Sequence, residues 1–590
     1  MQINRKALLP VAAVLGLAAL FGCKQKPQDA ELTLLYTTDL HGAILPYDFN
    51  KDKVAATSMA NVATYVKQER AKDKDGVLLL DAGDFLQGQP SIYYSNFEDT
   101  IGEHIQARVM EYVGYEAAAV GNHDIEPGEA VYSRVQKDFD FPWLAANAID
   151  TRTGKPFFQP YAVYEKNGIK VAVLGMITPN IQAWLPKYLW ENIEFRDMVE
   201  TAQEWVPYIQ QKEKPDLLIG LFHSGSDYTA NGSTIDTYKN ENGAIPAVTK
   251  VDGFDIALLG HDHQEKVDEI TNNFGNKVVI LDAQTGARYV GRADIKLHRN
   301  GDKYEKTITP SLVEMKNVPQ DSAFVAAFSK DVKQINEYVD AQIGLLSDTL
   351  RSTDALYGPS EFMDLIHDAQ LEATGADVSF AGVLSTDAVI PTGKLTMRNL
   401  FTLYKYENLL YTMSLSGKEI KDFLEYGFGR QYNQMKSPKD HLLNFKKDEK
   451  GNLVKSARFG YSFVTPSFNF TSAAGIKYTV DVTKPVGERV TILSMSDGTP
   501  FDADKQYKVA VNSYQASGGG GFFFEGLGFT KEQTDARVIN ASKNDVRKYI
   551  ADYIRKQQTI TPKSRGDWKV IPENYFEAGK ATDMKLMGGK

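Results

Sequence analysis

Asp, Asn and His side chains follow short apolar segments at several separate places in this 590-residue chain. These residues are Asp39, His41, Asp84, Asn122, His123, His223, His261 and His263. A short apolar run rich in Val, Leu and Ile predicts a buried strand. In a parallel or mixed sheet, the carboxyl ends of such strands border the ligand crevice. Because imidazoles, carboxylates and amide oxygens bind transition metals, the sequence predicts a metal centre at the edge of a sheet.

The distribution of histidine strengthens this prediction. A single Asp-x-His motif is weak, because it more often caps a helix or forms a polar pair. Five of the nine histidines nevertheless follow the strand-end pattern within one region of the chain, and His104, His298, His367 and His441 lack that context. The combined residue types suit a pair of metal ions, which can generate hydroxide and clamp the oxygens of a phosphate ester during in-line displacement.

Length and composition limit the class of protein. A chain of 590 residues is too long for one hydrophobic core, so two or more domains are expected. Hydrophobic residues at 43% and charged residues at 24% are typical of a globular protein. The net charge of −10 disfavours a nucleic-acid polymer as partner. A small anionic substrate is still allowed, because bound metal ions reverse the local field.

The first 22 residues predict a secretory signal. Arg5 and Lys6 precede an apolar run over residues 7–21, which is shorter than the roughly 20 residues of a membrane-spanning helix. The ending Leu20-Phe21-Gly22-Cys23 resembles a bacterial lipobox, which implies cleavage before Cys23 and lipidation of its thiol. An uncleaved anchor is the alternative. We therefore expect an extracytoplasmic protein, anchored by lipid to a bacterial membrane in the periplasm or at the cell surface, and without an internal disulfide.

From Leu32 onward, apolar strands alternate with amphipathic segments, which predicts a layered α/β domain. The expected strands are 32–37, 77–80, 117–120, 170–176, 216–222, 256–259 and 277–281, and the expected helices include 56–72, 105–113 and 360–373. Apolar residues at 324, 328, 332, 335 and 339 predict a helix that connects two domains, or alternatively a peripheral helix of the first domain.

The chain therefore divides into six expected segments. These are a signal peptide at 1–22, a tether at 23–31, a first domain at 32–318, a connecting helix at 319–345, a second domain at 346–575 and a tail at 576–590. The residues from Ala578 onward are small and charged, and we expect them to be frayed.

Several motifs together resemble a known family. The series Thr38-Asp39-Leu40-His41, Gly83-Asp84, Gly121-Asn122-His123-Asp124, His223 and Gly260-His261-Asp262-His263 resembles the calcineurin-like metallophosphoesterases. Segments 403–411, 415–422 and 512–519 resemble the C-terminal domain of bacterial 5′-nucleotidases, and more closely the 2′,3′-cyclic-nucleotide 2′-phosphodiesterase/3′-nucleotidase branch. The resemblance covers about residues 32 to 570. It implies a four-layer αββα sandwich plus a C-terminal α/β nucleotide-binding domain, and a hydrolase that releases phosphate from nucleotides.

The resemblance also implies a role for each strand-end residue. One divalent ion, Zn²⁺ or Mn²⁺, would be held by Asp39, His41 and His263. A second would be held by Asn122, His223 and His261, and Asp84 would bridge the two. A metal-bound hydroxide would attack phosphorus, and His123 would stabilise the transition state or protonate the leaving oxygen. Glu126 takes the place of the family Asp that orients this His, and its side chain is one methylene longer.

The resemblance places the nucleoside base between two aromatic side chains of the second domain. Tyr514 would contact one face, and Phe468 is preferred over Phe470 for the other, although core packing is the alternative for either ring. Such stacking contributes roughly 1–3 kcal/mol per ring. Gly518 and Gly519, in the run Gly518–Gly521, fit a loop where the backbone approaches the substrate. A phosphate-cradling loop is disfavoured, because no Lys-Ser/Thr follows the run.

Two departures from the 5′-nucleotidase pattern affect the substrate. The family arginine in Asn-Gly-Gly-Gly-Ile-Arg is missing from segment 380–387, and Gly520 stands where the family has Asp. Both losses suit a cyclic diester, which carries less negative charge than a phosphate monoester. Two alternatives to a nucleotidase are a metallophosphoesterase of another phosphate ester and a nucleotide-binding lipoprotein without turnover. We expect a monomer, and the resemblance implies that its two domains rotate about the connecting helix.

Overall fold

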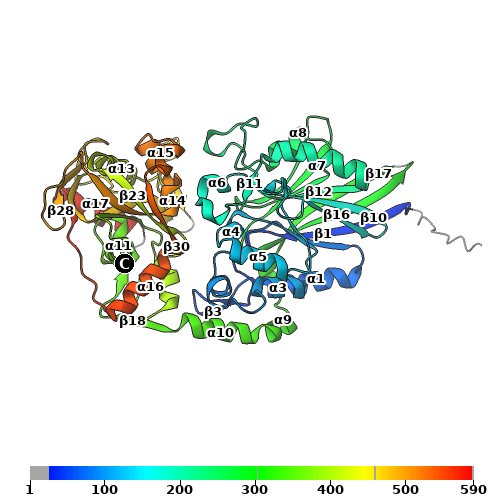
Figure 1. The fold of residues 1–590 in the computed structure, drawn as a ribbon, viewed down its shortest axis with the longest axis horizontal. Coiled ribbons are helices and arrows are strands. Elements are labelled where there is room, and N and C mark those ends of the chain that lie inside the picture. Colours follow the sequence, from blue (N-terminus) through cyan, green and yellow to red (C-terminus); the bar gives the residue numbers. More distant parts are fainter. Residues whose placement is uncertain (1–25, 302, 457–459, 588–590) are drawn as a thin grey trace, which may run out of the picture.

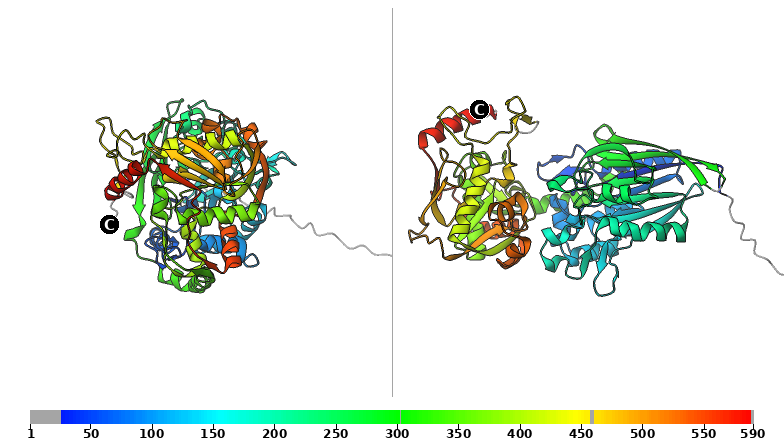
Figure 2. Two further views of the ribbon diagram at one scale, coloured as in Figure 1. Left: turned by 90° about the vertical axis from the view of Figure 1, so that its left-hand side faces the viewer. Right: turned by 90° about the horizontal axis from the view of Figure 1, so that it is seen from above.

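The computed structural model describes residues 26–301, 303–456 and 460–587, so the predicted signal peptide and Cys23 lie outside the described residues. The chain folds into an N-terminal and a C-terminal lobe that lie side by side (Figure 1). Figure 2 shows the same two lobes from two further directions. Within these residues, no helix has both the length and the apolar composition needed to cross a membrane.

The N-terminal lobe contains two six-stranded sheets. One has the strand order β17-β16-β1-β4-β5-β6 and the other β14-β15-β13-β12-β10-β9. The strands of the first sheet are β1 (Asp29–Thr37), β4 (Val77–Asp81), β5 (Ala117–Ala119), β6 (Trp143–Leu144), β16 (Tyr289–Asn300) and β17 (Lys303–Glu314). Those of the second are β9 (Tyr161–Lys166), β10 (Ile169–Ile177), β12 (Leu217–His223), β13 (Ile256–Leu259), β14 (Glu265–Thr271) and β15 (Lys277–Ala283).

Three apolar layers separate four layers of secondary structure. One core lies between the sheets, where Leu34 and Leu80 of the first sheet meet Val173 and Leu258 of the second. A second core packs the outer face of the first sheet against α1 (Met59–Lys72), α3 (Ile105–Val113) and α5 (Glu129–Asp138). A third packs the second sheet against α7 (Met198–Glu213) and α8 (Ala244–Lys250). The lobe is thus an αββα sandwich, and the predicted fold class is confirmed.

The predicted single connecting helix is interrupted. Residues in this region form α9 (Ser322–Ala327) and α10 (Ser329–Val339), which meet at Phe328, where φ is −100° and ψ is 10°. Phe324 and Val339 pack into the core of the N-terminal lobe, and α10 leads to β18 (Gln342–Leu346) in the C-terminal lobe (Figure 1). The apolar periodicity continues across the break because both helices cover the same core, so the sequence pattern did not reveal it.

The C-terminal lobe is built on a five-stranded sheet of order β26-β20-β29-β23-β30. Its strands are β20 (Val378–Gly382), β23 (Leu409–Ser416), β26 (Thr471–Ala474), β29 (Gln506–Asn512) and β30 (Val538–Asp545). Helices α11 (Glu361–Thr374), α13 (Gly417–Gln431) and α16 (Val546–Gln557) contribute to its core. Phe423 of α13 stacks on Phe380 with ring centroids 4.1 Å apart, and on Phe522 at 4.5 Å.

The expectation of a frayed C-terminal tail is wrong for the residues up to Leu586. They form helix α17 (Glu573–Leu586). The buried carboxylate of Asp583 bonds Nδ1 of His441 at 2.6 Å and accepts a hydrogen bond from the backbone N–H of Leu443 at 2.8 Å. This contact joins segments 140 residues apart in sequence, so local composition did not predict it.

Candidate active site

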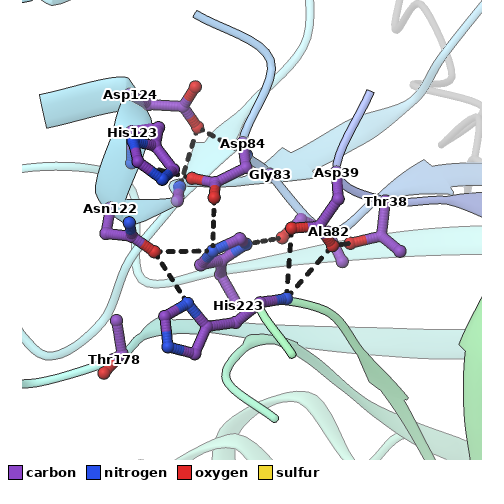
Figure 3. A network of polar contacts seen from close by, with 12 residues as sticks. Thr38, Asp39, Ala82, Gly83, Asp84, Asn122, His123, Asp124, Thr178 and His223 are labelled. Atoms are coloured by element: carbon purple, nitrogen blue, oxygen red, sulfur yellow. Dashed lines mark hydrogen bonds and ion pairs between the residues drawn. The ribbon is translucent and has the colours of Figure 1, made fainter. Parts of the chain in front are cut away.

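Both sheets of the N-terminal lobe contribute side chains to one site at the carboxyl ends of their strands. Asp39 and His41 follow β1, Asp84 follows β4, Asn122 and His123 begin α4 (Asn122–Ile125) after β5, His223 ends β12, and His261 and His263 follow β13. These strands are neighbours in parallel within each sheet. Figure 3 shows Asp84 between the pair Asn122 and His123 on one side and Asp39 on the other.

Backbone conformation directs these side chains into the crevice. Five of the predicted ligands have positive φ: Asp39 at 49°, His41 at 43°, Asp84 at 63°, His261 at 80° and His263 at 55°. Positive φ is uncommon for residues other than glycine, and strain of this kind concentrates at functional sites. The tight turn before Asp84 depends on Gly83, whose φ is 93° and where an added Cβ would lie 2.7 Å from the backbone nitrogen of Gly121.

A first cluster consists of Asp39, His41 and His263. Nε2 of His263 lies 3.2 Å from Oδ1 of Asp39 and 3.1 Å from Nε2 of His41. Burial acts to raise the pKa of Asp39, but the hydrogen bond from His263 and the charge of His223 lower it. Burial lowers the pKa of His41 to about 4. Two imidazole nitrogens thus face each other beside one ionised carboxylate.

A second cluster consists of Asp84, His223 and His261, with Asn122 beside them. Oδ1 of Asn122 lies 3.0 Å from Nε2 of His223 and 2.9 Å from Nδ1 of His261. Oδ2 of Asp84 lies 3.2 Å from Nε2 of His223 and 3.9 Å from Nε2 of His41 in the first cluster. Burial opposes the ionised form of Asp84, but the charges of His223 and His123 hold its pKa well below its usual range.

The residues present fit two divalent metal ions. In each cluster, one ligand atom per residue lies within 4.8 Å of the others. Converging imidazole nitrogens repel one another unless a proton or a cation lies between them, and the donor set of nitrogen and carboxylate oxygen suits Zn²⁺ or Mn²⁺. Asp84 faces both clusters, so its position is compatible with a shared ligand.

His123 and Glu126 form a pair at the edge of these clusters. Nδ1 of His123 lies 2.5 Å from Oε2 of Glu126, so the longer carboxylate reaches the ring. Burial acts to lower the pKa of His123, but Asp84 and Glu126 outweigh it and raise the pKa to about 10. The ring of His123 lies 5.4 Å from that of His41, so its proton is close to both clusters.

A cavity of about 850 Å³ lies between the second cluster and the C-terminal lobe. The N-terminal lobe lines it with Asn122, His123, Glu126, Asn180, Ala183, Trp184, Leu185, Glu241 and His261. The C-terminal lobe lines it with Asn408, Arg430, Pro466, Phe468, Asn469, Ser513, Tyr514, Ser517, Gly518, Gly519, Gly520, Gly521, Phe524 and Glu525. Two of the predicted metal ligands, Asn122 and His261, therefore line the same cavity as the predicted substrate contacts.

Two family models match the two lobes. Residues 32–265 match the calcineurin-like phosphoesterase family, and residues 332–526 match the 5′-nucleotidase C-terminal domain. The chain combines a calcineurin-like phosphoesterase domain with a 5′-nucleotidase C-terminal domain. It is accordingly a metal-dependent phosphoric ester hydrolase, and the predicted enzyme class is confirmed.

Curated relatives include nucleotide phosphoesterases, and a solved structure shares the fold. The phosphoesterase is 28% identical to the trifunctional nucleotide phosphoesterase YfkN of Bacillus subtilis over 604 residues, which cover 92% of this chain and 39% of that protein. It is 26% identical to the 2′,3′-cyclic-nucleotide 2′-phosphodiesterase/3′-nucleotidase of Salmonella typhimurium, over 94% of this chain and 91% of the relative. The fold matches a 5′-nucleotidase from Thermus thermophilus with a TM-score of 0.58 and 21% identity, covering 92% of this chain and 100% of the other.

The predicted aromatic pair of the nucleotidase domain is not arranged as two parallel rings. Phe468 and Tyr514 lie edge to face, with centroids 6.0 Å apart and planes at 82°. Phe468 also borders a second cavity of about 440 Å³, which Tyr406 lines as well. Phe470 is 1% exposed and packs in the core, so of the two candidates only Phe468 reaches the cavity.

The glycine loop of the nucleotidase domain packs against Asn469. Gly520 has a φ of 72°, and a Cβ added there would lie 2.6 Å from Oδ1 of Asn469. That oxygen is buried and has no hydrogen-bond partner among the residues that the structure describes. The carboxamide of Asn469 thus occupies the space next to the position where the resemblance expects an aspartate.

Sequence reasoning assigned no role to several residues of the site. The carboxylate of Asp124 accepts hydrogen bonds from the backbone N–H groups of Gly121, Asp84, Phe85 and Leu86, and so ties two ligand-bearing loops together. Asp124 belongs to the family motif, so that motif was a usable signal. Glu241, which bonds His261 at 3.0 Å, lies in a loop without a local signal.

Proposed function

We propose that this phosphoesterase is an extracytoplasmic, dinuclear-metal nucleotide phosphohydrolase that releases phosphate from nucleotides. The observation that supports this proposal is the position of Asp84. It belongs to the second ligand cluster and also faces His41 of the first. Asn122 and His261, beside it in the second cluster, line a cavity whose opposite wall is the nucleotidase domain. Residues of the second cluster and the aromatic side chains of Phe468 and Tyr514 therefore border one cavity, which supports a nucleotide as the substrate.

Each residue would have a distinct part in the reaction. Asp39, His41 and His263 would hold one divalent ion, Asn122, His223 and His261 the other, and Asp84 would bridge them. The bound ions, Zn²⁺ or Mn²⁺, supply a nucleophile from water and neutralise charge at the phosphate. Glu126 occupies Nδ1 of His123, which leaves Nε2 for the substrate. Because its neighbours raise the pKa of His123, this side chain would hold the proton that the leaving oxygen requires.

The charge of the cavity bears on the choice of nucleotide. Arg430 is the cationic side chain other than histidine among the residues that line it, and its guanidinium already donates to the Tyr426 hydroxyl and to the carbonyl of Gly520. A substrate with one negative charge therefore needs less compensation than a monoester. This supports 2′,3′-cyclic nucleotides and 3′-nucleotides as substrates alongside 5′-nucleotides, with the base against Phe468, Tyr514 and the backbone of Gly518 and Gly519.

The proposed location depends on the N-terminal sequence. Lipidation of Cys23 would anchor the protein to a bacterial membrane, and the nucleotide would be hydrolysed outside the cytoplasm by a monomer. Mass spectrometry of the membrane fraction tests this directly, because Cys23→Ser would abolish the lipid adduct and release the protein into the soluble extracytoplasmic fraction. Retention of that variant on the membrane would contradict the anchor.

The function is tested by phosphate release from metal-loaded protein. The substrates are 5′-AMP, 3′-AMP, 2′,3′-cyclic AMP with a monoesterase added, and glucose 6-phosphate. Activity on one or more nucleotides, with little on the sugar phosphate, is the expected result. Activity on the sugar phosphate alone would favour a phosphoesterase of another ester. Nucleotide binding without turnover, at confirmed metal occupancy, would favour a binding lipoprotein.

A further inference from the structure

The imidazole of His261 is bonded at both of its nitrogens. Nδ1 faces Oδ1 of Asn122 at 2.9 Å, on the side of the second ligand cluster. Nε2 points the opposite way, to Oε1 of Glu241 at 3.0 Å. If His261 binds a metal beside Asn122, the nitrogen that does so is Nδ1, and Nε2 then carries the proton that Glu241 accepts.

Glu241 lies on a backbone segment that is fixed from several sides. Its carbonyl oxygen accepts hydrogen bonds from Oγ1 of Thr178 at 2.9 Å and from Oγ of Ser224 at 3.1 Å. Ser224 directly follows His223 at the end of β12. The loop that presents Glu241 is therefore bound to the strand end that presents another ligand of the same cluster.

The two asparagines that flank Glu241 secure this loop. Each is 4% exposed. Nδ2 of Asn240 donates to the carbonyl of Tyr228 at 2.9 Å, and Nδ2 of Asn242 donates to the carbonyl of Asp227 at 2.8 Å. Oδ1 of Asn242 accepts from the backbone N–H of Gly225 at 3.1 Å. Because its backbone is held in this way, Glu241 has a fixed position from which its carboxylate can orient the ring of His261.

Trp184 closes one face of the same imidazole. Its indole stacks on His261 with centroids 5.5 Å apart and planes at 21°. Trp184 ends helix α6 (Ile181–Trp184), and its carbonyl accepts a hydrogen bond from Oγ of Ser517 in the nucleotidase domain at 2.7 Å. Glu241 and Trp184 thus contact the ring at Nε2 and on one face, while Nδ1 faces the cluster.

We propose that Glu241 is a positioning residue that fixes the tautomer and the orientation of His261, so that the lone pair of Nδ1 points at the second metal ion. The inference rests on the metal pair of the proposed function. A carboxylate that accepts the outer N–H of a ligand imidazole makes the ring more basic, and loss of such a partner typically costs 10- to 100-fold in metal affinity. Glu241 also lines the cavity, so direct substrate contact is the competing role.

The test is a titration of metal-free protein with Zn²⁺ by calorimetry, without substrate. Wild type is expected to bind two ions. Glu241→Ala is expected to bind the second ion about 10- to 100-fold more weakly and the first ion unchanged. Glu241→Gln keeps the shape and a neutral acceptor, so its loss is expected to be smaller. Asp236→Asn is the matched control, because Asp236 lies in the same loop, is 82% exposed and bonds Lys250 instead.

The outcomes separate this role from the others. Unchanged binding of both ions to Glu241→Ala and Glu241→Gln, with a raised KM for nucleotides, would overturn the proposal and make Glu241 a substrate contact. Equal weakening of both ions, or weakening in Asp236→Asn, would also overturn it. If wild type binds two ions but hydrolyses no nucleotide, the proposed function fails while the positioning of His261 still stands on the metal titration.

Discussion

At the scale of single residues, the site depends on where its charges lie. Asp84 is buried and faces histidines of both clusters, and its Oδ1 accepts the backbone N–H of His123 at 2.8 Å. This one carboxylate therefore connects the ligand clusters to the proposed acid. A neutral side chain of the same shape would leave the geometry but remove the charge that, in the proposed function, two cations would share.

Asp84→Asn is expected to lose turnover and one equivalent of bound metal. The physical reason is that an amide oxygen is a much weaker bridge between two cations than a carboxylate. Phosphate release and metal content measure the two effects. Asp81→Asn is the control, because Asp81 is also buried, burial raises its pKa to about 8, and its side chain accepts from Thr37 and from the backbone N–H of Gly83 rather than from a histidine. Full activity of Asp84→Asn with two metals bound would disprove the bridging role.

Asp84 and Glu126 together raise the proton affinity of His123, which gives a pH prediction for Glu126. The raised pKa keeps His123 protonated, so activity that needs this proton is lost as pH rises through that pKa. Glu126→Gln removes one charge that favours the protonated ring, so the alkaline limb of kcat is expected at a pH lower by about 1–3 units. Bound cations lower the pH of the alkaline limb in every variant, so the measured quantity is the difference in that pH between variants.

Glu126→Asp is the matched control for this experiment. It keeps the negative charge and shortens the side chain to the family length, so its alkaline limb is expected close to that of wild type. Coincident limbs in wild type and Glu126→Gln would contradict the role of Glu126.

At the scale of elements, strand ends and helix caps place the site. Helix α3 begins after His104, whose Nδ1 accepts the backbone N–H of Gln106 at 3.2 Å and whose Nε2 bonds Oδ1 of Asn96 at 2.9 Å. His104 is fully buried, and burial lowers its pKa to about 3. In the sequence, His104 lacks the strand-end context and has no predicted role, whereas in the structure it is a neutral helix cap within the core.

This cap makes stability depend on pH. His104 binds a proton near pH 6.5 in the unfolded chain but only near pH 3 in the folded chain. Its contribution to the free energy of unfolding is therefore complete above about pH 6.5 and is lost as pH drops, by about 1.4 kcal/mol per pH unit. His104→Asn keeps a capping side chain but does not titrate. Between pH 6.5 and pH 5, the free energy of unfolding in urea, measured without metal, is expected to fall by about 2 kcal/mol more in wild type than in His104→Asn.

The exposed His298 provides the control, because His298→Asn is expected to leave the pH dependence of unfolding as in wild type. Parallel pH dependence in wild type and His104→Asn would show that His104 does not carry the effect.

At the scale of the whole molecule, a buried cation lies where the two domains meet. Arg547 is fully buried, with its guanidinium 4.0 Å from the ring centre of Phe401 and 5.2 Å from that of Tyr93, which belongs to the phosphoesterase domain. Glu407 and Asp545 lie 3.9 and 3.6 Å from it. Because taking charges out of water is costly, this buried cation depends on the partners that surround it, including the one from the neighbouring domain.

Tyr93→Ala is expected to loosen the arrangement of the domains. Loss of a desolvated cation–π contact costs about 2 kcal/mol, and water then reaches Arg547. Small-angle scattering is expected to show a larger radius of gyration for Tyr93→Ala. Tyr208→Ala is the control, because Tyr208 is 45% exposed on α7, and its removal is expected to leave the scattering curve as in wild type. Identical curves for all three proteins would refute the contribution of Tyr93.

The sequence alone determined the features that depend on local order. Apolar runs end where strands end, so the positions of Asp39, Asp84 and His223 at strand ends could be predicted. The alternation of apolar and amphipathic segments predicted the α/β fold class. Helix α3 was expected at 105–113 and is observed at Ile105–Val113 for the same reason. Local propensity and hydrophobic periodicity act over a few residues, and the sequence displays both directly.

Tertiary structure alone decided the features that depend on distant neighbours. It set Phe468 and Tyr514 edge to face, placed Glu241 behind His261, and folded the C-terminal residues into α17 through Asp583. None of these contacts has a periodic signal, because each joins side chains that are close only after the sheets and the two domains have packed. A residue type at a strand end indicates which chemistry is available, whereas three-dimensional packing determines which partners surround it.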